Sequence, residues 1–413
     1  MATFASTSYD TLARRRIDLH DVLLTMLGLS IAVEIAFGGR LFAFELAALV
    51  LLPALALRYR RLGAVPAAFV ALGLLWLDGQ VMTDIVRGTA AGDFTRGWSK
   101  IAMTVSNFVV LQMLIGRDRR RMLLFAAALA VGLVARHWLS PTAYGIADPW
   151  KFGYGWGLTL GGVVAGAALS ARMGGMTGVA VILCLGTLNM IEGFRSLAGV
   201  CFVTAVYLCA RHVRLNYSPG KRRRPIVTGG ILIVAAFAFV QAYTAAAQRG
   251  VLGADARDKA TLQADGPLGL PMSGRPEFRV SLGAALDSPL LGHGSWARDT
   301  KYVDQLRALG LHVSPAVAAE GLIPTHSHIM GAWVEAGALG LPFWLWVLAV
   351  SLIALARGLD AEGAVVVLGV FLAVALVWDV PFSPFGAERR IIVPFTIIVL
   401  LELCRGQSVR SHT

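Results

Sequence analysis

The chain has 413 residues, of which 56% are hydrophobic and only 15% are charged. This composition gives more apolar surface than one soluble domain can bury, so it excludes an ordinary soluble protein. The formal net charge is +12, but the basic residues gather in short connections between apolar runs. Basic residues placed in this way are typical of the cytoplasmic loops of membrane proteins, and they argue against a nucleic-acid partner.

Apolar runs of about 15 to 20 residues recur along the chain, and this length crosses the hydrocarbon core of a lipid bilayer. They predict an all-α polytopic membrane protein with about twelve transmembrane helices. The predicted spans are residues 21–37, 41–57, 64–77, 98–115, 122–139, 155–171, 176–191, 197–210, 226–243, 329–356, 363–378 and 391–404.

Clusters of basic residues separate several of these spans. The clusters lie at residues 14–16, 58–61, 117–121 and 221–224. Because cytoplasmic loops carry the excess of Lys and Arg, both termini are predicted to lie in the cytoplasm. The shorter polar segments are then predicted to be external, and they cover residues 78–97, 140–154 and 379–390.

One long polar segment, residues 244–328, is rich in Gly, Pro and charge. It separates nine predicted helices in residues 1–243 from three in residues 329–413, within one membrane domain overall. This topology makes the segment an external, periplasmic loop between helices 9 and 10. Because structureless loops of this length are uncommon, we expect it to fold over the membrane domain. Its amphipathic stretches predict short helices at 276–287 and 299–309.

The four cysteines all lie inside apolar runs, and none lies in the long loop. They are Cys184, Cys201, Cys209 and Cys404. A disulfide or a cysteine-based zinc site is therefore not expected.

Two histidines close the long loop, directly before the predicted helix that starts at residue 329. His328 lies at the membrane boundary, where an imidazole that titrates near neutral pH is suited to act as a general base. Either His326 or His328 can instead simply cap the helix. No Asp or Glu stands at ligand spacing beside them, so we expect neither a metal ion nor a cofactor.

Three arginines are candidates for binding an anionic substrate. Arg275 and Arg279 lie in the long loop, and Arg195 lies between two apolar runs on the same outer side. A guanidinium group is a permanent cation whose paired donors suit phosphate, and a charge close to lipid is a functional candidate. Solvated loop charges, or snorkelling of Arg195 to the headgroups, are the simpler interpretations. We expect the three arginines and His328 to face one interface.

Two glycines and a glutamate are predicted to support these residues. Gly292 and Gly294 flank His293 in the loop, and Glu335 lies in the helix that follows His328. A Gly-x-Gly sequence indicates a backbone conformation that other residues rarely adopt. His293 is interpreted as a turn residue, and the simpler interpretation of Glu335 is that it only bonds its neighbours.

These motifs, in this order, resemble the O-antigen ligase and polymerase superfamily. The matching motifs are Arg195-Ser196, Gly274-Arg275, Pro289 to Gly294, and His328 followed by Glu335, Gly337, Gly340 and Leu341. Each motif is short, and the resemblance comes from their order, their spacing and the twelve-helix layout over most of the chain.

The resemblance implies a metal-independent, inverting glycosyltransferase of a bacterial inner membrane. Such an enzyme transfers a glycan from undecaprenyl pyrophosphate to an acceptor, such as lipid A core, at the periplasmic face. The arginines that match Arg195 and Arg275 hold the pyrophosphate, and the histidine that matches His328 activates the acceptor hydroxyl. Ile329 stands where the family commonly has Asn, which leaves His326 open as the base, although the spacing to Glu335 favours His328.

Two other functions compete with the ligase. An O-antigen or exopolysaccharide polymerase would use the same donor with a second lipid-linked glycan as acceptor, and only the single dominant outer loop favours a ligase. A transporter or flippase would also have about twelve helices, but it predicts inverted repeats. The sequence shows no such symmetry, and the long loop would have no role in transport.

Overall fold

The computed structural model of the chain describes residues 18–36, 38–58, 63–217, 245, 249–250, 276–308 and 320–405. Within these residues the structure is almost entirely helical, with one antiparallel hairpin of strands β1 (Glu34–Ala36) and β2 (Arg40–Phe42). The predicted span 226–243, and the predicted site residue Arg275 with its neighbour Gly274, lie outside the described residues.

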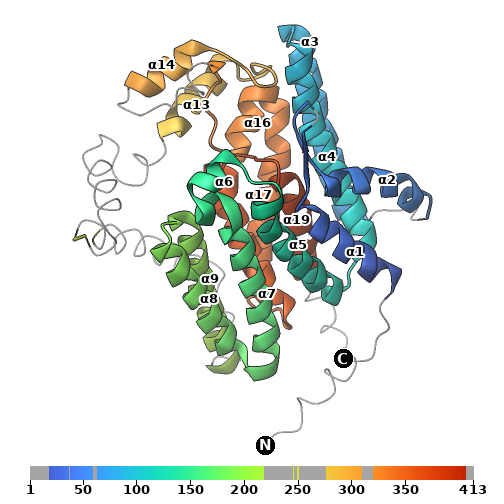
Figure 1. Ribbon diagram of the computed structural model, residues 1–413, viewed down its shortest axis with the longest axis vertical. Coiled ribbons are helices and arrows are strands. Elements are labelled where there is room, and N and C mark those ends of the chain that lie inside the picture. Colours follow the sequence, from blue (N-terminus) through green and yellow to red (C-terminus); the bar gives the residue numbers. More distant parts are fainter. Residues whose placement is uncertain are drawn as a thin grey trace, which may run out of the picture.

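The helices form a bundle with two short helices of the long loop at one end (Figure 1). In chain order the helical elements are α1 (Leu19–Ser30), α2 (Ala43–Arg58), α3 (Ala64–Arg87), α4 (Ala91–Ile115), α5 (Arg119–Leu139), α6 (Ala143–Ala147), the π-helix η1 (Pro149–Tyr154), α7 (Gly155–Met173), α8 (Gly175–Ile191), α9 (Arg195–Tyr217), α13 (Pro276–Asp287), α14 (Thr300–Ala308), α16 (His328–Ala336), the 3-10 helix η2 (Gly337–Gly340), α17 (Leu341–Gly358), α18 (Val365–Phe382) and α19 (Arg389–Arg405).

Seven helical segments of the described residues are long and apolar enough to cross a membrane. They are α3, α4, α5, η1 with α7, α9, α16 through α17, and α18, and shorter apolar helices are α1, α2 and α8. The chain is therefore an all-α, multi-pass membrane protein. Each predicted span that falls in the described residues overlaps a helix, while the count of twelve crossings stays a prediction.

The N-terminal region differs from the prediction. The helix expected over residues 21–37 ends at Ser30, and the chain turns back through the hairpin. Gly38 allows this turn because it has a φ of 61°, a left-handed conformation that suits glycine. Arg40 pairs with Glu34 across the hairpin. The next helix, α2, lies across the long axis of the molecule (Figure 1).

The predicted external segment 78–97 is largely helical, which corrects the sequence interpretation. Helix α3 continues to Arg87, Gly88 caps it in a left-handed conformation, and α4 begins at Ala91. The apolar run ends near residue 77 because polar side chains occupy one face of the next turns. That face lies against the long loop and not against lipid, so the helix does not end where its hydrophobicity does.

The core of the bundle surrounds α18. Most residues of α18 are buried, and it packs against α7, α9, α16, α17 and α19. A second, smaller core lies between α13, α14 and α16, where Val280, Tyr302, Leu306 and Val334 are buried together. Helices α13 and α14 confirm the short helices predicted for the long loop. We call the part of the molecule formed by α13, α14 and α16 the loop end.

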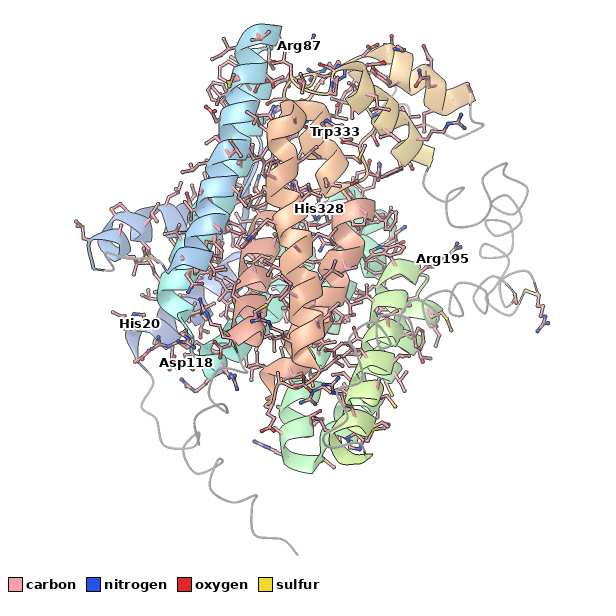
Figure 2. The ribbon with its side chains drawn as sticks, turned by 180° about the vertical axis from the view of Figure 1, so that it is seen from behind. His20, Arg87, Asp118, Arg195, His328 and Trp333 are labelled. Atoms are coloured by element: carbon pink, nitrogen blue, oxygen red, sulfur yellow. The ribbon has the colours of Figure 1, made fainter. Side chains whose placement is uncertain are left out.

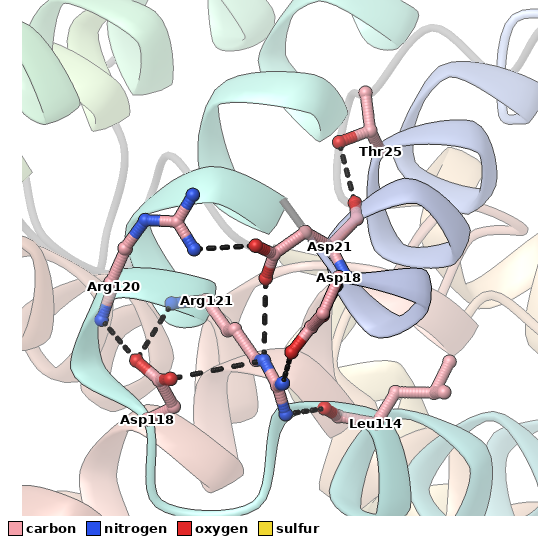
Figure 3. A network of polar contacts seen from close by, with 7 residues as sticks. All are labelled: Asp18, Asp21, Thr25, Leu114, Asp118, Arg120 and Arg121. Carbon is pink, nitrogen blue, oxygen red and sulfur yellow. Dashed lines mark hydrogen bonds and ion pairs between the residues drawn. The ribbon is translucent and has the colours of Figure 1, made fainter. Parts of the chain in front are cut away.

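The opposite part, the basic end, contains the turn between α4 and α5 and the start of α1. Figure 3 shows how its charges pair. The Asp118 carboxylate caps α5 by accepting from the backbone amide of Arg120 at 2.9 Å, and the side chain of Arg120 donates to Asp21 at 2.5 Å. Arg121 pairs with both Asp18 and Asp21. The basic connection thus ties α1 to α5.

Candidate functional site

A break in a membrane helix organises the site. Helix α16 ends at Ala336, and Gly337 takes a left-handed φ of 64° before the chain continues through η2 into α17. A side chain at Gly337 would lie 2.1 Å from the carbonyl oxygen of Leu290, so only glycine fits here. The break leaves the last carbonyl groups of α16 without amide partners from the next helical turn.

The long loop supplies those partners. The amide of His293 donates to the carbonyl of Val334 at 2.7 Å, and the amide of Gly294 donates to the carbonyl of Glu335 at 3.1 Å. Buried backbone groups need such partners, above all at the depth of a membrane. The loop backbone is therefore an integral part of the broken helix.

The predicted glycines Gly292 and Gly294 both take left-handed conformations, with φ of 85° and 93°. A side chain at Gly292 would lie 2.6 Å from the amide nitrogen of Gly337, and one at Gly294 would approach Asp84. Both positions allow backbone to pass close to a neighbouring element. This is the structural reason for the Gly-x-Gly sequence.

The C-terminal half of α3 binds the same loop. Arg87 donates to the carbonyl of Gly292 at 2.7 and 3.0 Å, and Figure 2 shows it at the far end of α3. The two carboxylate oxygens of Asp84 accept from the amide and the hydroxyl of Ser295, at 2.7 and 2.6 Å. Gln80 also donates to the Ser295 hydroxyl.

The sequence interpretation missed this face because it assigned the segment to a loop. The signal was present in the spacing of Gln80, Thr83, Asp84 and Arg87, since residues three, four and seven positions apart share one side of a helix. Such a polar face beyond an apolar run indicates a helix that continues alongside protein.

Beside this loop lies a cavity of about 190 Å³. It is lined by residues from α3, α4, the loop, α16 and the connection between α18 and α19, among them Trp76, Lys100, Trp296, His328, Glu335 and Phe385. The predicted residues His328 and Glu335 therefore share one wall. The sequence analysis did not select Lys100 or either tryptophan as a site residue.

Lys100 and Glu335 form an ion pair at the cavity. The Lys100 ammonium lies 2.5 Å from the Glu335 carboxylate, and both side chains are largely buried. The same ammonium lies 5.3 Å from the centre of the Trp296 ring, within the range of a cation–π contact. One lysine thus contacts both a carboxylate and an aromatic face.

His328 begins α16 and is almost fully buried. Its Nδ1 lies 2.5 Å from the carbonyl oxygen of Ser383, and its ring contacts Trp344 and Phe385 edge to face. Because a carbonyl oxygen only accepts, Nδ1 must carry the proton. Burial favours the uncharged ring, in which Nε2 holds the lone pair, and this nitrogen has no hydrogen-bond partner among the described residues.

The group that orients His328 is itself held in place. The Ser383 hydroxyl donates to Asp379 at 2.6 Å, and Arg389 pairs with the other oxygen of Asp379 at 2.5 Å. On the helix side, the Ser327 hydroxyl caps α16 and donates to the carbonyl of Val380. The imidazole is therefore fixed from two helices, as a base with a defined tautomer requires.

The other predicted residues lie away from the cavity wall. His326 is exposed, two residues before His328, and Arg279 is exposed on α13. Arg195 begins α9 at the periphery of the molecule, whereas His328 lies near its middle (Figure 2). Arg195 does not line the cavity, so among the described residues the cation beside His328's cavity is Lys100.

No family model, no curated protein and no solved structure matches the chain.

Proposed function

We propose that the protein is a metal-independent, inverting glycosyltransferase that transfers a glycan from undecaprenyl pyrophosphate to an acceptor, with His328 as the general base. This is the function that the resemblance to the O-antigen ligase and polymerase superfamily implies, with an acceptor such as lipid A core at the periplasmic face of a bacterial inner membrane. The proposal is supported by the cavity at the loop end of a multi-pass membrane protein.

The observation that carries the proposal is the tautomer of His328. Its Nδ1 donates to the Ser383 carbonyl, and its buried Nε2, which holds the lone pair when the ring is uncharged, has no hydrogen-bond partner among the described residues, on a residue that lines a cavity. A histidine that serves only to cap a helix has no need of this second constraint. His326 is exposed and lacks such an orienting contact in the described structure, which supports His328 as the base.

The proposed transfer is a direct displacement at the anomeric carbon of the donor glycan. Nε2 of His328 accepts the proton of the acceptor hydroxyl as its oxygen forms a bond to the anomeric carbon. The bond from that carbon to the pyrophosphate oxygen breaks on the opposite side, which inverts the centre, and the pyrophosphate leaves with the electron pair. Fixed cations near a low-dielectric surface stabilise the charge that develops on it. The assignment of this role to Arg195, Arg275 and Arg279 stays a prediction.

The base is tested by exchanging each histidine for glutamine in the purified protein and measuring glycan transfer from a lipid-linked donor. His328→Gln is expected to lower the rate about 10²- to 10⁴-fold, the usual contribution of a general base. His326→Gln is the matched control and should keep most of the rate. Loss of transfer in His326→Gln alone would assign the base to His326, and normal transfer in both variants would overturn the proposal.

The acceptor is tested in a deletion strain. A strain without a ligase accumulates long lipid-linked polymer, as proposed here. A strain that instead carries a single repeat unit would identify a polymerase.

A further inference from the structure

The cavity is close to neutral in charge. Its described lining has three ionisable side chains, Lys100, Glu335 and His328, and the first two neutralise each other in an ion pair. His328 is almost fully buried against Trp344 and Phe385, which favours the uncharged form of its ring. A pyrophosphate group placed here would be desolvated without a free cation to compensate it, which is unfavourable. The charge of the cavity therefore favours an uncharged ligand.

Trp296 lies in the cavity wall in a strained conformation. Its φ is 51°, the one positive value for a residue other than glycine in the part of the chain that the structure describes. For a bulky residue this conformation is costly, and it persists only where the surroundings enforce it. Asp84 holds the preceding Ser295 through two hydrogen bonds, and the amide of Ile323 donates to the carbonyl of the following Ala297.

The enforced conformation presents the indole beside the Lys100–Glu335 pair. An indole offers a flat apolar face, while the ammonium and the carboxylate offer hydrogen-bond donors and an acceptor. A pyranose ring has the complementary chemistry, with a face of C–H groups and a rim of hydroxyls. The cavity of about 190 Å³ is also smaller than pockets for drug-sized ligands, roughly 300–1,000 Å³, so its size suits a single ring.

We propose that this cavity is a subsite for one neutral sugar ring, which stacks on Trp296 and hydrogen-bonds the Lys100–Glu335 pair, while the pyrophosphate stays outside it. The identification of this sugar as part of the acceptor or donor glycan rests on the proposed function. Sugar binding itself rests on the cavity, its charge and its aromatic wall.

The test follows the fluorine NMR signal of 5-fluorotryptophan at position 296 in the full chain in lipid nanodiscs, assigned with Trp296→Phe. The probes are the methyl glycosides of glucose, galactose and N-acetylglucosamine, and inorganic pyrophosphate. At least one glycoside is expected to shift the signal in a saturable manner, and pyrophosphate is not. No response to any glycoside, or a response to pyrophosphate alone, would overturn the subsite.

Removing the Glu335 carboxylate should reverse the preference of the cavity for a glycoside over pyrophosphate. Glu335→Gln leaves the Lys100 ammonium unpaired, so pyrophosphate is expected to shift the signal and the glycoside to bind at least tenfold more weakly. If this variant does not fold, the doubly substituted Lys100→Met, Glu335→Gln protein removes both charges, and it should lose glycoside binding without gaining pyrophosphate binding. Unchanged glycoside affinity in the variant that folds contradicts the role of the pair.

A second ion pair of the chain provides the matched control. Lys301 pairs with Asp287 at 2.7 Å and lies 5.1 Å from the Tyr302 ring, but it does not line the cavity. Asp287→Asn unpairs that lysine and should change neither ligand's binding.

The transfer assay separates this proposal from the proposed function. If the protein transfers glycan at a normal rate but the fluorine signal at Trp296 responds to none of the glycosides, the subsite alone is refuted. Sugar binding in a protein whose His328 and His326 variants transfer normally would refute the catalytic proposal and leave the subsite standing.

Discussion

The two ends of the bundle use charge in different ways. At the basic end, arginines pair with carboxylates that belong to other helix ends, as Arg119 does with Glu402 and Arg120 with Asp21. At the loop end, the side chains of α3 bind loop backbone, and the Lys100–Glu335 pair borders an open space. The charges of the basic end join helices to one another. The Lys100–Glu335 pair of the loop end also lines a cavity, which is why we place the candidate site there.

The largest expected difference between the ends concerns two aspartates. Asp84→Ala leaves the amide and hydroxyl of Ser295 and the indole N–H of Trp98 without their acceptor, and it should destabilise the protein by about 3 kcal/mol. Asp118→Ala removes the cap of α5 at the basic end and should cost about 1 kcal/mol. Unfolding of the detergent-solubilised variants measures both values. An equal loss would show that the loop end is no more tightly constrained than the basic end.

A smaller effect tests the strain at Trp296. Trp296→Ala and Trp296→Gly both remove the indole, but only glycine tolerates a φ of 51° without strain. The glycine variant should be more stable than the alanine variant by about 1 kcal/mol, the lower end of the cost of a left-handed residue. Unfolding of the two detergent-solubilised variants measures this difference in stability. A more stable alanine variant would mean that the loop does not enforce this conformation.

The smallest effect concerns the exposed Lys301–Asp287 pair of the loop end. Hydrogen bonds from Lys301 and then Tyr302 hold the pKa of the Asp287 carboxyl below its ordinary value of 3.8. A lowered pKa in the folded state stabilises the loop above the unfolded pKa, and this contribution is lost as the pH falls through the folded value. The protection of the α14 amides, measured as exchange relative to the intrinsic rate at each pH, should therefore fall below pH 3.8. Asp287→Asn should remove that pH dependence, and its persistence would assign it to another group.

Much of the fold could be predicted from the sequence because apolar runs long enough to cross a bilayer indicate helices, including one such as α18 that is buried within the bundle. The helices of the loop were also predictable, since α13 and α14 keep an amphipathic pattern. The extension of α3 to Arg87 was not, because its polar face lies against protein and resembles a loop in composition. The hairpin after Ser30 was missed since the run of apolar residues continues past the end of α1.

The site was predictable only where its residues lie close together in sequence. His328, Glu335, Gly292 and Gly294 belong to local motifs, and the structure places them around one broken helix and its loop. Lys100 is 235 positions from Glu335, and no local pattern connects the two. The peripheral position of Arg195 is likewise a consequence of helix packing, which short motifs do not encode.

The hydrogen bonds between the loop and the broken helix have a consequence for biogenesis. Two carbonyl groups of α16 would face hydrocarbon without a partner if that helix entered the bilayer before residues 293 and 294 were available. These residues precede α16 in the chain, so a ribosome delivers them first. Docking of residues 293 and 294 against α16 is therefore expected to be a prerequisite for stable insertion of the C-terminal helices.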